Sequence, residues 1–165
     1  MFQFAKRSLL ILLGVMLLAA CGKPSFESIA YPQPYEGNEL MVQLSPTQEK
    51  YDLDEPILLR FTITNQTGKT VRIPRAYSPL EDRFTTDYFH ISRKKHRVFY
   101  KAQRLQRLPY LSLSKVKLKA GESISAVVDI REGYTIEKSG KYRVQFMGSH
   151  INRLPDSEVL EIKIK

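Results

Sequence analysis

Basic and aromatic side chains cluster between residues 93 and 107 of the 165-residue chain. Such a cluster on a hairpin can grip an acidic protein face or anionic lipid headgroups through charge and through cation stacking on rings. Lysines at a hairpin tip also guard a sheet edge against pairing with foreign strands. The pattern therefore leaves a partner-binding surface and a solvated hairpin tip as alternatives. The candidate binding residues are Arg93, Lys94, Lys95, Arg97, Tyr100, Lys101, Arg104 and Arg107.

The second chemically distinctive residue is Cys21, the only cysteine of the chain. Two basic residues, Lys6 and Arg7, precede an apolar run over residues 8–18, and two alanines separate this run from Cys21. This is the order of charged, apolar and small segments of a signal peptide. The apolar run is shorter than the roughly 17 to 25 residues that a membrane-spanning helix needs. We therefore expect residues 1–20 to be a cleaved signal peptide; an uncleaved membrane anchor is the alternative.

The segment Leu-Ala-Ala-Cys that ends at Cys21 closely resembles the bacterial lipobox. The lipobox cysteine receives a diacylglyceryl group and, after cleavage, usually an N-acyl chain. Two or more acyl chains anchor a protein stably to a membrane, whereas one does so only marginally. Because Gly22 lacks the acidic character of the usual inner-membrane retention signal, the resemblance favours the outer membrane, facing the periplasm. Export also makes nucleic acid the least suitable partner.

No other residue pattern indicates catalysis. The three histidines, His90, His96 and His150, have no metal-ligand spacing, and no further cysteine exists to complete a zinc site. Neither a Gly-x-Ser-x-Gly motif nor a glycine-rich phosphate loop occurs. The acidic run at residues 52–55 lacks the spacing and the glycine of a calcium loop, so it is interpreted as a solvated turn. We expect no catalytic residue, no metal and no cofactor.

Between Cys21 and residue 38 the chain contains three prolines and little apolar periodicity. Residues 21–38 are therefore predicted to be an extended tether, able to span up to roughly 50 Å; a docking peptide at residues 31–35 is the alternative. Loss of Lys6 and Arg7 with the signal peptide lowers the formal net charge from +9 to +7. This charge favours anionic partners, although it also serves solubility.

From residue 39 onward apolar residues recur at every second position, as in half-buried strands. The pattern predicts one domain over residues 39–165, an all-β antiparallel sandwich of about seven to nine strands. A break of phase is expected near residues 114–115, and a short helical turn is possible only within residues 101–108. Phe61, Val128 and Tyr142 are predicted to face inward. The positions that alternate in phase along the clearest strands are Leu40, Val42, Leu44, Ile57, Leu59, Phe61, Ile63, Ile124, Ala126, Val128, Ile130, Tyr142, Val144, Phe146, Leu160, Ile162 and Ile164.

The order of short motifs over residues 40–147 resembles the immunoglobulin-like β-domain of deuterolysin-type (aspzincin) zinc metallopeptidases. The matching segments are Leu44-Ser45, Glu55-Pro56-Ile57, Phe61-Thr62-Ile63-Thr64-Asn65, Tyr88-Phe89-His90-Ile91, Val98-Phe99-Tyr100, Leu118-Lys119-Ala120-Gly121-Glu122-Ser123, Val128-Asp129-Ile130 and Gly140-Lys141-Tyr142-Arg143-Val144. In those enzymes the domain is a propeptide that restrains the protease. This chain has no His-Glu-x-x-His and its sequence stops at Lys165, so we expect no catalytic domain. A looser similarity is to free-standing immunoglobulin-like proteinase inhibitors of bacteria.

These observations favour a non-enzymatic, lipid-anchored protein of the cell envelope. We expect its immunoglobulin-like domain to bind an envelope or secreted protein. The resemblance implies a secreted metallopeptidase that it restrains or escorts. The alternative is a structural envelope lipoprotein whose basic face contacts anionic lipid or lipopolysaccharide.

Overall fold

The computed structural model describes residues 39–105 and 114–165. The expected signal peptide, the tether, Cys21 and Arg107 lie outside these described residues. Within the described ranges, no helix is long and apolar enough to cross a membrane.

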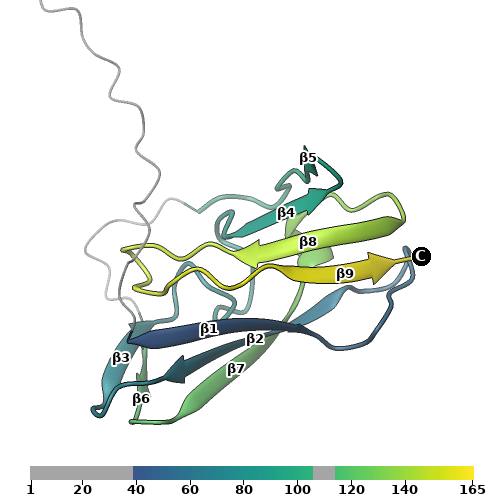
Figure 1. The fold of residues 1–165 in the computed structure, drawn as a ribbon. Helices are drawn as coiled ribbons and strands as arrows, with labels where there is room; N and C mark the ends of the chain where they lie inside the picture. Colours follow the sequence, from purple (N-terminus) through teal and green to yellow (C-terminus); the bar gives the residue numbers. More distant parts are fainter. Residues whose placement is uncertain (1–38, 106–113) are drawn as a thin grey trace, which may run out of the picture. The chain divides into compact units, whose positions relative to one another are not determined.

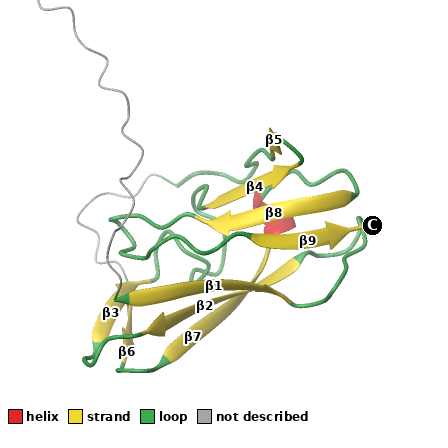
Figure 2. Cartoon of the chain, in the orientation of Figure 1, coloured by secondary structure: helices red, strands yellow, loops and turns green. Residues whose placement is uncertain are grey.

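The described chain consists of short strands with one helical turn (Figure 2). The elements are β1 (Leu40–Pro46), β2 (Leu58–Asn65), β3 (Val71–Pro74), β4 (Phe89–Arg93), β5 (His96–Arg97), β6 (Lys115–Leu118), β7 (Ser123–Asp129), α1 (Ile130–Gly133), β8 (Gly140–Phe146) and β9 (Leu160–Ile164).

The strands form two facing layers (Figure 1). One sheet has the order β1-β2-β7 and the other β5-β4-β8-β9, while β3 and β6 form a separate pair. Every pairing between named strands is antiparallel. First, second and seventh strands in one layer, with fourth, eighth and ninth in the other, reproduce the immunoglobulin strand order. The predicted all-β, antiparallel immunoglobulin-like sandwich is therefore confirmed.

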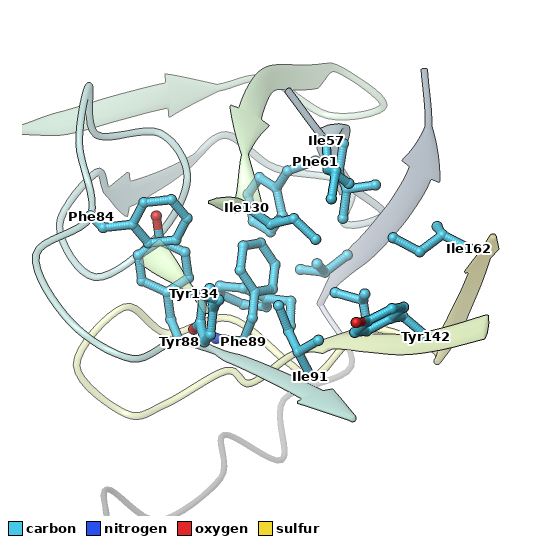
Figure 3. Packing of buried hydrophobic residues seen from close by; sticks show 14 of the residues in the cluster. Ile57, Phe61, Phe84, Tyr88, Phe89, Ile91, Ile130, Tyr134, Tyr142 and Ile162 are labelled. Carbon is cyan, nitrogen blue, oxygen red and sulfur yellow. The ribbon is translucent and has the colours of Figure 1, made fainter. Parts of the chain in front are cut away.

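The inner faces of the two sheets meet in an aliphatic and aromatic core (Figure 3). Phe61 of β2 contacts Phe146 of β8 with ring centroids 4.8 Å apart, so one pair of rings joins the layers. Phe61 and Tyr142 are buried, as their strand phases predicted. Val128 has the predicted phase but is only partly buried, because β7 is the last strand of its sheet.

Beside this core, Phe84, Tyr88, Phe89 and Tyr134 pack ring against ring (Figure 3). The Phe84 and Tyr88 rings are stacked with centroids 5.2 Å apart. Gly133 permits this packing, because a Cβ atom there would lie only 2.7 Å from the Phe84 ring. A side chain at this position would displace the aromatic cluster.

The helical turn lies elsewhere than predicted. The described part of the expected segment, residues 101–105, contains no helix, whereas residues Ile130–Gly133 form α1. Asp129 caps this turn, since one of its carboxylate oxygens accepts from the amides of Arg131 and Ile57, each at 3.0 Å. A four-residue turn is too short to show helical periodicity, and a capping aspartate at a strand end is not distinctive.

Candidate partner-binding surface

Arg93, Lys94, Lys95 and Arg97 lie on the β4–β5 hairpin, at one edge of the four-stranded sheet, and Lys101 and Arg104 follow β5. Arg93 of β4 pairs with His96 of β5, so Lys94 and Lys95 form a two-residue connection. Lys94 has a φ of 57°, a left-handed conformation that suits Gly or Asn better than Lys. Both lysines are exposed, and neither forms an ion pair within the described residues.

Arg93 serves the fold more than the surface. Its Nε donates a 2.9 Å hydrogen bond to the Ser139 carbonyl oxygen, which fixes the turn that leads into β8. The guanidinium also lies beside Gly140, where a Cβ would be 3.0 Å from the Arg93 Nε atom. Arg93 thus has a structural role in the turn before β8.

Arg97 and Arg104 converge on one carboxylate, that of Asp87. Their guanidinium nitrogens lie 3.1 Å and 3.4 Å from the same Asp87 oxygen, Oδ2. The Asp87 side chain is only 15% exposed, whereas both arginines are largely open to solvent. Part of the positive charge expected from the sequence is therefore neutralised inside the protein.

The other Asp87 oxygen connects this cluster to the core. Oδ1 accepts a 2.9 Å hydrogen bond from the Tyr134 hydroxyl, and this hydroxyl accepts one of 2.8 Å from the Phe89 amide. Burial, followed by the negative charge of Asp87, raises the pKa of Tyr134 well above its ordinary value. Tyr134 therefore remains a neutral donor that fixes the Asp87 carboxylate in place.

The segment after β5 alternates between buried and exposed positions. Val98 is buried and Tyr100 is partly buried, whereas Arg97, Phe99 and Lys101 are exposed. Backbone bonds hold this segment: the Phe99 carbonyl accepts from Thr135 at 3.0 Å, and the Lys101 amide donates to Gly133 at 2.8 Å. The outward face therefore presents an exposed Phe99 between two cations.

Tyr100 lies beneath this face and supports it. Its ring packs edge-on against Tyr134 at 5.4 Å, and the Arg104 guanidinium lies 5.6 Å from its ring centroid, within cation–π range. The Tyr100 hydroxyl is buried and has no hydrogen-bond partner among the described residues, and burial raises the pKa of this tyrosine. Tyr100 thus positions Arg104 and is not a free contact ring.

The structure thus brings together most of the predicted surface and adds two residues. Arg97, Tyr100, Lys101 and Arg104 lie on one return segment beside the hairpin. Sequence reasoning missed Asp87 and Tyr134, which hold it. A lone aspartate 10 residues before Arg97 carries no signal in the sequence.

Residues that might have formed a metal site are not gathered. His90, His96 and His150 are exposed, and the described residues contain no group of three or more potential ligands. In the acidic run, Glu55 accepts a 2.8 Å hydrogen bond from the Asp52 amide, as in a self-closed turn. The interpretation of residues 52–55 as a turn is confirmed.

Comparison with known proteins gives distant likenesses only. No family model and no curated protein matches the chain. A β-glucosidase from Listeria innocua in complex with glucose aligns at 15% identity and a TM-score of 0.41, over 82% of this chain but only 17% of the enzyme. A CARDB domain from Pyrococcus furiosus in complex with di-metal ions aligns at 10% identity and a TM-score of 0.38, over 84% of this chain and 97% of that one. Neither likeness transfers an activity, a ligand or a family to this chain.

Proposed function

We propose that this chain is a lipid-anchored, non-enzymatic protein of the cell envelope whose immunoglobulin-like domain binds another envelope or secreted protein. The observation that carries the proposal is Phe99, 78% exposed between the outward cations Arg97 and Lys101. A large apolar ring held in water, with charges on both sides, is typical of a contact surface. A partner with an acidic rim around an apolar pocket fits this face.

Rigidity supports the same proposal. Backbone bonds hold Phe99, and the Asp87 carboxylate, fixed by Tyr134, holds Arg97. A surface that is ordered before binding loses less entropy on association. Within the proposal, the partner suggested by the sequence resemblance is a secreted metallopeptidase that the domain restrains or escorts.

Lipid attachment at Cys21 is a separate part of the proposal with its own test. A Cys21→Ser variant should accumulate as unprocessed precursor and should take up no fatty-acid probe in growing cells. Continued labelling of the variant would exclude this anchor.

The basic hairpin is tested by charge removal from the full chain. Replacing Lys94, Lys95 and Arg97 by Gln should lower the association rate with an acidic protein partner, and most strongly at low salt, where the Debye length is about 10 Å at 0.1 M. The matched control replaces Lys50, Lys115 and Lys117, which are exposed and outside the hairpin, by Gln. An equal loss in both variants would mean that net charge, and not this face, governs binding.

The alternative is a structural lipoprotein that contacts anionic lipid or lipopolysaccharide, because exposed cations beside a phenylalanine also suit a membrane surface. Vesicles with and without anionic lipid separate the two functions. If the hairpin variant loses vesicle binding while protein capture is unchanged, the structural function replaces the protein-binding one.

A Phe99→Ser variant should weaken capture of the protein partner even at high salt, where charge is screened.

A further inference from the structure

Among the described residues, β7 is an edge strand of the three-stranded sheet, with β2 as its strand partner on one side (Figure 1). Glu122 accepts from the Asn65 amide, and the Ile130 amide donates to Ile57, so even-numbered residues turn their backbone groups toward β2. In an antiparallel ladder the residues between them turn the other way. The outward residues are Ser123, Ser125 and Val127, whose backbone groups have no strand partner in the described ranges.

This edge lacks the usual protections against strand pairing. Natural edge strands are shortened, carry Lys or Pro, or are interrupted by bulges. The seven residues of β7 include neither Lys nor Pro, and their pairing with β2 is regular from Leu58 to Thr64. Such an edge is a template for an added strand.

A groove accompanies the open edge. It has a volume of about 410 Å³ and lies between β7 and the segment 79–84. Leu80, Phe84 and Tyr88 line one side of it, although each of them is buried. On the other side, Ile124, Ala126 and Val128 have the inward phase of β7 but are only partly buried. These three β7 residues therefore leave apolar surface against which alternate side chains of an extended peptide can pack.

The charges along the groove differ from those of the whole molecule. Its charged residues are Arg75, Glu81, Asp82, Arg83, Asp129 and Glu132. They carry a formal charge of −2 on a chain of net charge +9. A second copy of this chain would bring the same acidic rim against its own, within a repulsive overall field. A segment that carries a cation fits better.

We propose that the β7 edge and its groove bind an extended segment of a partner protein as an added strand. The segment has apolar side chains at alternate positions and a basic residue for the acidic rim. This site is distinct from the hairpin surface, and it does not depend on the function proposed there.

The first test uses the full chain and a labelled synthetic peptide that alternates valine and threonine, with lysine at each end. Fluorescence anisotropy should report binding. Methylation of alternate peptide nitrogens on the edge that meets β7 should weaken it about tenfold or more, because several net hydrogen bonds are lost. Replacing the lysines by glutamate should also weaken it. Equal binding of the methylated peptide would overturn the proposal without any change to the protein.

A variant pair then places the site on β7. Ser125→Pro removes an outward amide while leaving the bonds to β2 in place, and Ser125→Ala removes only the hydroxyl, which contacts Thr62 at 2.8 Å. Peptide binding should be lost in the first variant and kept in the second, with thermal midpoints compared. Unchanged binding by a folded Ser125→Pro variant would overturn the site. If the Ser125→Pro variant does not fold, the comparison of methylated and unmethylated peptides tests the proposal by itself.

Two outcomes distinguish this proposal from binding at the hairpin surface and from dimerisation of this chain. The hairpin variant at Lys94, Lys95 and Arg97 should bind the peptide normally, so failure of one surface leaves the other standing. A concentration-dependent dimer in sedimentation that Ser125→Pro abolishes, without peptide binding, would make a second copy of the chain the occupant and overturn the partner peptide.

Discussion

Two of the sheet edges in the described chain, β5 and β7, are built in opposite ways. The β5 edge is two residues long and is surrounded by cations. The β7 edge is seven residues long and carries no ionisable side chain before Asp129. Charge prevents the first edge from pairing with strands, whereas the second remains open to backbone pairing. Under the two proposals above, the sandwich offers one surface that selects partners by charge and another that selects them by backbone hydrogen bonds.

The comparison also shows that charge in the sequence differs from charge on the surface. Asp87 neutralises part of Arg97 and Arg104, and Arg93 is tied to a carbonyl. The cations left for a partner are chiefly Lys94, Lys95 and Lys101. The β7 edge differs in this respect. Its sequence has no distinctive feature, and its open edge follows only from the lack of a second neighbouring strand among the described residues.

The largest expected effect comes from a core substitution that destabilises both sheets and therefore both edges. Phe61→Ala removes a ring that joins the sheets through Phe146, and it should lower the free energy of unfolding by about 3 to 5 kcal/mol. Its neighbour Thr62 faces outward, so Thr62→Ala should cost under about 1 kcal/mol. Urea unfolding of the full chain measures both, and similar small losses would contradict the assigned strand phase.

Alkaline pH should have the next largest effect, through two buried tyrosines: Tyr134 beneath the hairpin surface and Tyr88 along the β7 groove. Burial raises the pKa values of Tyr88 and Tyr134 above their ordinary range, so the folded state keeps protons that the unfolded chain releases near pH 10. Their contribution is complete below that pH. Above it, stability should fall by about 1.4 kcal/mol per pH unit for each tyrosine. Absorbance of tyrosinate, followed together with unfolding, tests this; early ionisation of both residues in the folded protein would refute it.

The sandwich was predictable because alternation with a period of two is a local property. The inward phases of β1, β2, β8 and β9 follow from it directly. The same alternation in β7 says nothing about whether another strand lies beside it. Ile124, Ala126 and Val128 have the pattern of Leu59, Phe61 and Ile63 in β2 but are less buried. The groove therefore could not be derived from the strand pattern.

The charge cluster of the hairpin surface was predictable from the sequence. The side chains that fix this cluster in place were not. Asp87 meets Tyr134 across 47 residues of sequence. Nothing local marks either residue, since the contact exists only after β4 and the segment following α1 lie side by side. Long-range polar contacts of this kind depend on the tertiary fold, which a single sequence does not specify residue by residue.

A smaller effect is expected from a change at Asp87, the side chain that supports the arginines beside the hairpin. Asp87→Asn should keep an acceptor for Tyr134 but weaken the hold on Arg97 and Arg104, at about 1 to 2 kcal/mol of stability. At the same time one negative charge disappears beside the candidate surface, so association with anionic vesicles or an acidic partner should become faster. Peptide binding at β7 should not change. Slower association at unchanged stability would mean that the ordered arginines, and not the net charge, make the contact.

The smallest effect tests whether the hairpin tip retains a lysine against its backbone preference. Lys94 has a positive φ, and Asn tolerates this conformation better. Lys94→Asn should therefore stabilise the fold by about 0.5 to 1 kcal/mol. Lys95→Asn removes the same charge from the neighbouring position, which has no positive φ, and serves as the matched control with little change in stability.

Non-glycine residues held in this conformation are frequent at functional sites. If Lys94 acts in binding, its replacement should raise the thermal midpoint and slow association together, whereas Lys95→Asn should only slow association. A stabilised Lys94→Asn variant with unaltered association would leave the strained lysine without a role in binding.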